Sequence, residues 1–221
     1  MELTIAGKEV TLFGEAGSEA PLVVLHGTAS DGAEVYELAR GLTDVPFTMA
    51  VISGVDWNHD LCPWDCPPVH KKAQPCTGGA EGYLQELTEV ILPQLEQAAG
   101  LQPAYRVIAG YSLGGLFAIY SLYHCDVFSR AVSASGSLWY PNFLEDIQGR
   151  PTPQADRVYF SLGEKETQSR NPLLVEVQAR TEATCKLLTE AGAETVFEMN
   201  PGNHFTECNL RTAKGIAWVL R

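Results

Sequence analysis

Residues 107–120 read VIAGYSLGGLFAIY, and this stretch decides the fold that the sequence predicts. Its first three residues form an apolar run typical of a buried strand, and residues 116–120 indicate a helix. Between them Ser112 has Gly110 and Gly114 two residues away on either side, which is the G-x-S-x-G pattern of a nucleophile elbow. Side chains at either glycine would collide with the neighbouring strand and helix in such a strained turn. We therefore expect an exposed, nucleophilic Ser112 hydroxyl; the alternative is a glycine-rich turn with an exposed serine.

The same turn predicts an oxyanion site. The Leu113 N–H would lie at a helix N-terminus, where it can stabilise negative charge. A second donor is usual, and we expect it after an early strand, where Gly27 lets the backbone bend so that the Thr28 N–H faces the same point. His26, at the start of that loop, is predicted to be structural rather than a second base.

Outward from the elbow, apolar strands alternate with helical patterns along the whole chain. Residues 2–13 predict an antiparallel hairpin. Further strands are predicted at 22–25, 47–52, 131–134, 158–162 and 195–199, and helices at 33–41, 81–99, 171–191 and 207–220. Such alternation predicts an α/β fold with a mostly parallel sheet covered by helices on both faces. We expect one domain over 1–221, with a lid-like insertion at about 54–79.

The composition of the chain narrows its possible partners and its location. The chain has 221 residues, of which 45% are hydrophobic, which is ample for a core, and a formal net charge of −12. That charge disfavours nucleic acid and anionic membranes as partners. The first residues do not resemble a signal peptide, and no apolar run is long enough to span a membrane. A cytoplasmic protein with reduced cysteines is expected; the oligomeric state stays open.

A serine nucleophile needs a base and an acid that orients it. Of five histidines, His204 follows the last predicted strand, at the sheet edge where such folds build their sites, whereas His124 falls late in the elbow helix and is expected to be exposed. The acid should stand between the serine and the histidine in sequence. Glu164 and Glu166, after the 158–162 strand, are both candidates, and the residues alone barely separate them.

The 54–79 segment contains cysteines that are candidate metal ligands. Cys62, Cys66, His70 and Cys76 match no standard zinc spacing, so we predict no metal and no cofactor. Trp57 and Trp64 instead offer apolar area near the elbow, which favours a lid or a pocket wall. The alternative is an ordered loop packed on the sheet.

These motifs resemble those of the putative-esterase family of α/β-hydrolases, which includes S-formylglutathione hydrolases, feruloyl and acetylxylan esterases and siderophore trilactone esterases. The matching stretches cover nearly the whole chain after the first hairpin: 25–27, 56–58, 63–64, 110–115, 135–140, 163–166 and 202–204. The resemblance implies that Trp57, Trp64 and Trp139 contribute to substrate binding. It favours Glu166 as the acid, three residues after Gly163, although some siderophore esterases resemble a Ser–His dyad.

The sequence therefore predicts a serine esterase acting on a small-molecule ester. Ser112 would attack the carbonyl, His204 would relay the proton, and Glu166 would orient the imidazole. An acyltransferase or a thioesterase could use the same groups, and a non-catalytic binding protein with this fold is the alternative outside catalysis. The lid composition weakly suggests an aromatic or sugar-like acyl ester; the few nearby cations neither demand nor exclude a siderophore lactone.

Overall fold

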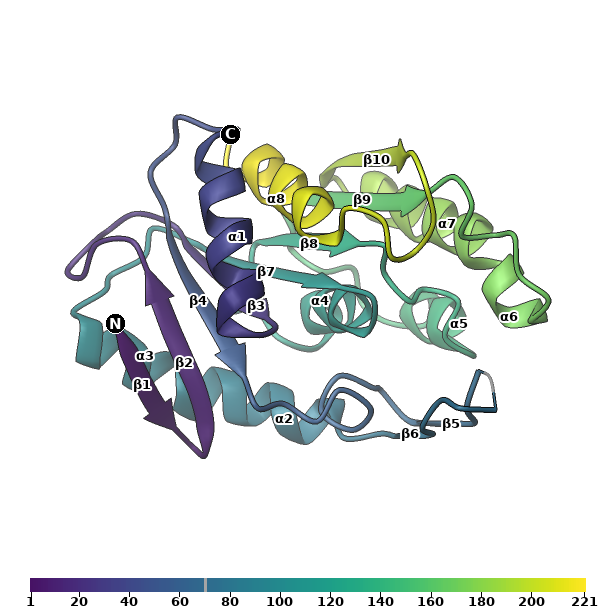
Figure 1. Cartoon of the computed structure of the whole chain (residues 1–221), viewed down its shortest axis with the longest axis horizontal. Coiled ribbons are helices and arrows are strands. Elements are labelled where there is room, and N and C mark those ends of the chain that lie inside the picture. The colour runs from purple at the N-terminus through teal and green to yellow at the C-terminus, as the bar shows by residue number, and fades with distance from the viewer. Residues whose placement is uncertain (70) are drawn as a thin grey trace.

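The structure, a computed structural model, describes residues 1–69 and 71–221. An eight-stranded sheet forms its centre, in the order β1-β2-β4-β3-β7-β8-β9-β10 (Figure 1). Its strands are β1 Glu2–Ile5, β2 Lys8–Phe13, β3 Leu22–His26, β4 Thr48–Ser53, β7 Arg106–Tyr111, β8 Arg130–Ala134, β9 Arg157–Gly163 and β10 Glu194–Asn200. Neighbours from β4 to β10 are parallel, and only β1–β2 and β2–β4 are antiparallel. The mostly parallel sheet and the N-terminal hairpin are thus confirmed.

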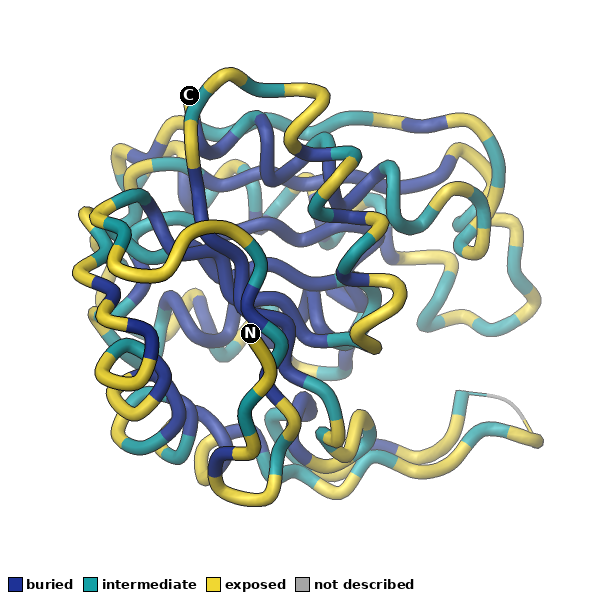
Figure 2. Tube along the Cα trace, turned by 60° about the vertical axis from the view of Figure 1, so that its left-hand side comes forward, coloured by how far each residue is buried: buried dark blue, intermediate teal, exposed yellow. Residues whose placement is uncertain are grey.

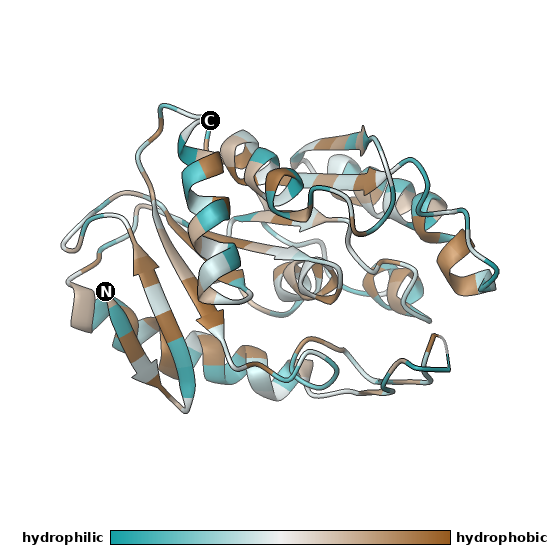
Figure 3. Cartoon of the chain, in the orientation of Figure 1, coloured by the Kyte–Doolittle hydropathy of each residue, from teal (hydrophilic) through white to brown (hydrophobic). Residues whose placement is uncertain are grey.

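Helices cover both faces of the sheet. The α1 helix (Ala29–Arg40) and the α8 helix (Cys208–Val219) pack together on one face. The elbow helix, α4 (Leu113–His124), lies on the other face with four further elements: α2 Ala80–Glu86, α3 Leu92–Ala99, α5 Phe143–Gln148 and α7 Val177–Glu190. Alternate side chains of a strand enter the two resulting cores, as Val23 and Val24 of β3 do. The inner strands β3, β4, β7, β8 and β9 are accordingly buried almost throughout, whereas β1, β2 and β10 are partly exposed (Figures 2 and 3).

Several helices differ from the predicted ranges. The α1 helix begins four residues before the predicted 33, because Thr28 caps it by accepting a hydrogen bond from the Asp31 N–H at 3.2 Å. The predicted 81–99 helix is α2 and α3 joined by a π-helical turn, Leu87–Ile91. The predicted 171–191 helix is divided into α6 (Pro172–Val175) and α7. The short α5 was not predicted, because six residues are too few to show helical periodicity.

The described residues of the 54–79 segment pack against the body of the protein. Its β5 (Asp65–Cys66) pairs antiparallel with β6 (Cys76–Thr77). At its start, Lys8 forms a 2.7 Å ion pair with Asp60. In its middle, the Trp64 Nε1–H donates to the carbonyl of Pro141 at 2.9 Å. These contacts hold the segment beside the carboxyl ends of the central strands.

Candidate active site

Ser112 occupies the sharp turn between β7 and α4, as the elbow pattern predicts. Its φ of 57° and ψ of −120° are strained for a residue with a side chain. A Cβ at Gly110 would lie 2.2 Å from the backbone of Gly114, which confirms that only glycine fits there. The matching expectation for Gly114 is wrong, because a Cβ there would only touch the Trp57 ring at 3.5 Å. The second close approach is at Gly115, where a Cβ would lie 2.9 Å from Gly136.

His204 reaches Ser112 from the loop between β10 and α8. Its Nε2 lies 3.1 Å from the Ser112 Oγ, within hydrogen-bond distance. The hydroxyl of Tyr111 donates to the carbonyl of His204 at 2.6 Å, which ties this loop to the strand that carries the serine. The imidazole is therefore placed to accept the serine proton.

Glu166 lies on the far side of the imidazole. Its Oε2 is 2.7 Å from His204 Nδ1, while its Oε1 accepts from the Gly163 N–H at 2.6 Å and from the Ser135 hydroxyl at 2.8 Å. Burial alone would raise the pKa of this carboxyl, but the hydrogen bonds from His204, Gly163 and Ser135 together hold the pKa below its ordinary value. The carboxylate is thus kept ionised beside the imidazole. Glu164 is exposed.

The two expected oxyanion donors lie near the ends of adjacent strands. Leu113 is the first residue of α4, so its N–H has no partner within the helix. Thr28 follows β3, which pairs with β7, but it is exposed and its hydroxyl donates to Asp31 Oδ2 at 2.6 Å. Among the described residues, Thr28 does not line the cavity that contains Ser112. The oxyanion role of both N–H groups stays a prediction.

A cavity of about 310 Å³ opens beside the Ser112 hydroxyl. The 54–79 segment forms one wall, and the elbow and the residues after β8 form the other. Its described lining is Asn58, Cys66, Pro67, Val69, Ala73, Gln74, Cys76, Ser112, Leu113, Ser137 and Trp139. The Ser137 Oγ lies 3.4 Å from the Ser112 Oγ. This placement of the segment supports a pocket wall over a loop packed on the sheet.

The three tryptophans expected to bind substrate lie in different places. Trp139 lines the cavity. Trp57 is 36% exposed and lies against the start of α4, outside the described lining. Trp64 packs edge-to-face on Tyr140, donates to the Pro141 carbonyl and lies outside the described lining, so its contact with substrate stays a prediction.

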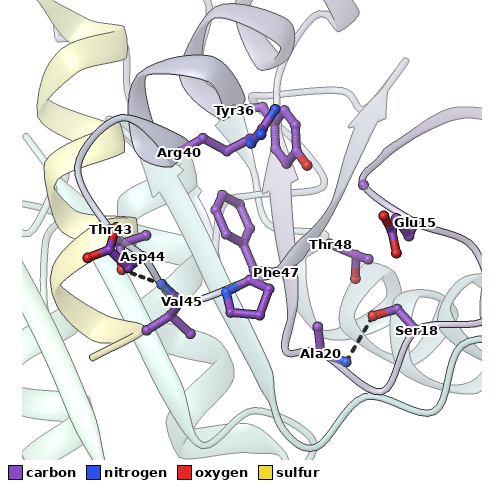
Figure 4. A pocket seen from close by; sticks show the side chains of 12 residues that line it. Glu15, Ser18, Ala20, Tyr36, Arg40, Thr43, Asp44, Val45, Phe47 and Thr48 are labelled. Atoms are coloured by element: carbon purple, nitrogen blue, oxygen red, sulfur yellow. Dashed lines mark hydrogen bonds between the residues drawn. The ribbon is translucent and has the colours of Figure 1, made fainter.

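A second hollow, of about 440 Å³, lies at the opposite end of the strands, around the loop before β4 (Figure 4). Tyr36 and Phe47 line it together with charged side chains that include Arg40. It contains none of the predicted site residues, and parallel sheets of this kind bind ligands at their carboxyl ends. We therefore do not assign the chemistry to this hollow.

The cysteines of the 54–79 segment do not form a metal centre with other described residues. All six cysteines of the chain are free, and the described part of the chain contains no group of three or more potential ligands that could hold a metal ion. His70, which the sequence offered as a further ligand, lies outside the described residues.

Two other histidines are withdrawn from solvent. His26 is 3% exposed, and its Nε2 lies 2.9 Å from the Tyr83 hydroxyl. Burial lowers its pKa to about 3, which keeps it neutral and confirms the predicted structural role. His124 is half-buried and stacks on Tyr120, which corrects the expectation that it is exposed. Burial, with a contribution from Arg150, lowers its pKa to about 4.

We expect His26 to make the folded protein sensitive to mild acid. An unfolded histidine has a pKa of about 6.5, whereas folded His26 has a pKa of about 3, so the unfolded state binds the extra proton as the pH falls. Stability is therefore lost below pH 6.5, and His26 contributes about 2 kcal/mol of loss between pH 7 and pH 5. In urea unfolding, His26→Gln should show a smaller loss over this range. Equal losses in both proteins would contradict this account.

Three residues around the site were not predicted from the sequence as site residues: Ser135, Ser137 and Arg211. Ser135 and Ser137 follow β8 at the carboxyl end of the sheet, so their position alone could have marked them. Arg211 lies in α8, belongs to no motif, and is brought to Glu166 only by the tertiary fold. Its side chain is 1% exposed.

The fold is that of the α/β-hydrolases, and the arrangement of Ser112, His204 and Glu166 is typical of the serine hydrolases of that class. The family model described as "Putative esterase" matches residues 25–206. The chain therefore belongs to this esterase family and is a serine esterase, as the resemblance predicted.

Solved structures with the same fold include three hydrolases. An IroE-like serine hydrolase from Shewanella oneidensis has a TM-score of 0.78 at 16% identity, over 96% of this chain and 75% of its own. The siderophore hydrolase EstA from Aspergillus nidulans has a TM-score of 0.73 at 17% identity, over 100% of this chain and 93% of its own. The enterobactin hydrolase IroE, in complex with DFP, has a TM-score of 0.71 at 20% identity, over 100% of this chain and 93% of its own. At these identities the likeness shows the fold alone. No curated protein sequence matches this chain.

Proposed function

We propose that this protein hydrolyses a small carboxylic ester through an acyl-enzyme on Ser112. The observation that carries the proposal is the continuous chain of hydrogen bonds from the Ser112 Oγ to Glu166 beside an open cavity, with 3.1 Å and 2.7 Å on the two sides of His204. A serine hydroxyl is a weak nucleophile until such a base takes its proton.

In the proposed reaction, the Ser112 Oγ attacks the ester carbonyl while His204 Nε2 takes its proton. Glu166 holds the Nδ1–H and stabilises the imidazolium that forms. The N–H groups of Leu113 and Thr28 would hold the oxyanion. His204 then gives the proton to the departing alcohol, and a water molecule, activated by the same imidazole, releases the acid from Ser112. No cofactor takes part in these steps.

The cavity supports an acyl group of moderate size. Its described lining combines apolar groups, among them Trp139 and Val69, with the side-chain amides of Asn58 and Gln74. An aromatic or sugar-like acyl group fits such a lining through ring contact and hydrogen bonding. Hydrolysis of a siderophore lactone is the alternative, which the structural similarity to siderophore and enterobactin hydrolases favours. Thioester hydrolysis and acyl transfer to another alcohol use the same groups.

No helix within the described residues is long and apolar enough to cross a membrane. The cytoplasmic location predicted from the sequence, and the absence of nucleic-acid and membrane partners, remain part of the proposal.

A panel of p-nitrophenyl esters and siderophore esters tests the proposal and the role of the cavity. We expect Trp139→Ala to lower kcat/KM for a bulky aryl ester roughly tenfold more than for the acetyl ester, because the ring provides binding area only to a large acyl group. Trp57→Ala, outside the described lining, is the matched control and should change the ratio less. An unchanged ratio in Trp139→Ala would place the acyl group elsewhere, and no turnover of any ester would favour a non-catalytic protein.

A further inference from the structure

Arg211 is a buried cation that joins the loops at the ends of four neighbouring strands. Its Nη1 donates to the hydroxyl of Tyr111 at 3.3 Å and to the hydroxyl of Ser135 at 3.1 Å, at the ends of β7 and β8. The same nitrogen lies 3.3 Å from Glu166 Oε1, after β9. Its Nη2 donates to the carbonyl of Pro201 at 2.8 Å, after β10 and three residues before His204. One guanidinium thus contacts the segments that carry every member of the candidate triad.

The local sequence leaves room for this guanidinium. A Cβ at Gly163 would lie 2.7 Å from the carbonyl oxygen of Gly202, 2.9 Å from Arg211 Nη2 and 3.0 Å from Nη1, so the bare backbone of Gly163 packs against both the Gly202 backbone and the planar guanidinium. The N–H of the same glycine donates to Glu166 Oε1. The Gly163–Glu166 turn is therefore shaped around Arg211 on one side and closed by the carboxylate on the other.

Stability alone does not account for an arginine at this place. Its side chain is 1% exposed, and its Nε–H has no hydrogen-bond partner among the described residues. An unpaired buried donor destabilises the folded state, and a buried ion pair is often no more stable than apolar residues of similar volume. The planar guanidinium does fix the relative positions of its acceptors, because it can bind a carboxylate and a carbonyl at the same time.

We propose that Arg211 is a positioning residue, which with Ser135 fixes Glu166 Oε1 so that Oε2 faces His204 Nδ1. Substrate does not reach the buried guanidinium, so it acts only through the carboxylate and the loops it holds. The inference rests on the proposed function, since it concerns the geometry of that triad. It adds a residue that the elbow and histidine motifs do not contain.

The role predicts a loss in turnover rather than in substrate binding. Arg211→Met should lower kcat for p-nitrophenyl acetate roughly 10- to 100-fold with KM nearly unchanged, because a small displacement of a catalytic group costs rate. Arg211→Lys, which keeps the charge but not the fork, should recover part of that loss. Arg130→Met is the matched control: Arg130 binds the Tyr105 hydroxyl and the Val219 carbonyl at the other end of α8, so its loss should leave kcat near the wild-type value.

A double-mutant cycle with Glu166→Gln tests whether Arg211 acts through the carboxylate. In the Glu166→Gln background, Arg211→Met should lower kcat by much less than it does in the wild type. Equal fold-losses in the two backgrounds, or a change confined to KM, would overturn the proposal. If Arg211→Met does not fold, the same cycle with Arg211→Lys decides it, and wild-type kcat in Arg211→Lys would overturn it as well. Absence of turnover in the wild type would instead refute the proposed function.

Discussion

Replacing Glu166 by glutamine should lower kcat for ester hydrolysis by about a thousandfold or more, whereas Glu164→Gln should leave it close to the wild-type value. The reason lies in the donors around Oε1. Gly163, Ser135 and Arg211 all point N–H or O–H groups at this atom, so the amide nitrogen of a glutamine cannot take its place. The NH₂ group must then face His204 Nδ1.

An amide donor at that position reverses the tautomer of the imidazole. His204 Nδ1 would have to accept the hydrogen bond, so the proton would move to Nε2, which faces Ser112 at 3.1 Å. An Nε2 that already carries a proton cannot accept one from the serine, and the base is lost while the geometry is kept. The structure thus predicts a large effect from the exchange of a single atom.

Steady-state kinetics with p-nitrophenyl acetate and a thermal unfolding curve for each variant measure this effect. Glu164→Gln is the matched control, because Glu164 stands two residues away and is exposed. A larger loss in Glu164→Gln would show that the wrong carboxylate was chosen. Wild-type kcat in both variants would indicate a Ser–His dyad.

The parts of the site that the sequence predicts are those set by local geometry. The elbow needs only a strand, a tight turn and a helix, and these are adjacent in the chain around Ser112. The position of His204 follows from the rule that parallel strands gather their carboxyl ends at one edge of the sheet. Both predictions therefore needed no knowledge of distant contacts.

The remaining parts depend on contacts between distant segments. Glu164 and Glu166 are two residues apart, and only the turn closed by the Gly163 N–H directs the second toward His204. Arg211 meets Glu166 across 45 positions of sequence. Trp64 looked equivalent to a pocket residue, yet its ring packs on Tyr140. Composition and spacing do not contain this information, because side-chain direction is decided by packing.

The sequence also led to a wrong prediction of steric crowding at Gly114. The G-x-S-x-G pattern suggested that Gly110 and Gly114 are the crowded positions, but the tight approach is between Gly110 and the backbone of Gly114 itself. The helix packs against the turn after β8 at Gly115, which the pattern does not include. Helix-to-loop packing at this point was not visible in the strand–turn–helix motif.

Ser112→Ala should abolish ester hydrolysis, with kcat falling by roughly 10⁴- to 10⁶-fold. Ser112 alone combines the strained elbow backbone with an Oγ at hydrogen-bond distance from His204. Ser137 is the neighbouring hydroxyl that could compete, since its Oγ lies 3.4 Å from that of Ser112. Ser137→Ala is therefore the matched control, and it should still react with a serine-directed probe.

Covalent labelling with a fluorophosphonate, followed by peptide mapping of the modified residue, identifies the nucleophile directly. We expect one adduct, on Ser112, in the wild type and in Ser137→Ala, and none in Ser112→Ala. Equal labelling of the wild type and Ser112→Ala, or an adduct mapped to another serine, would contradict this expectation.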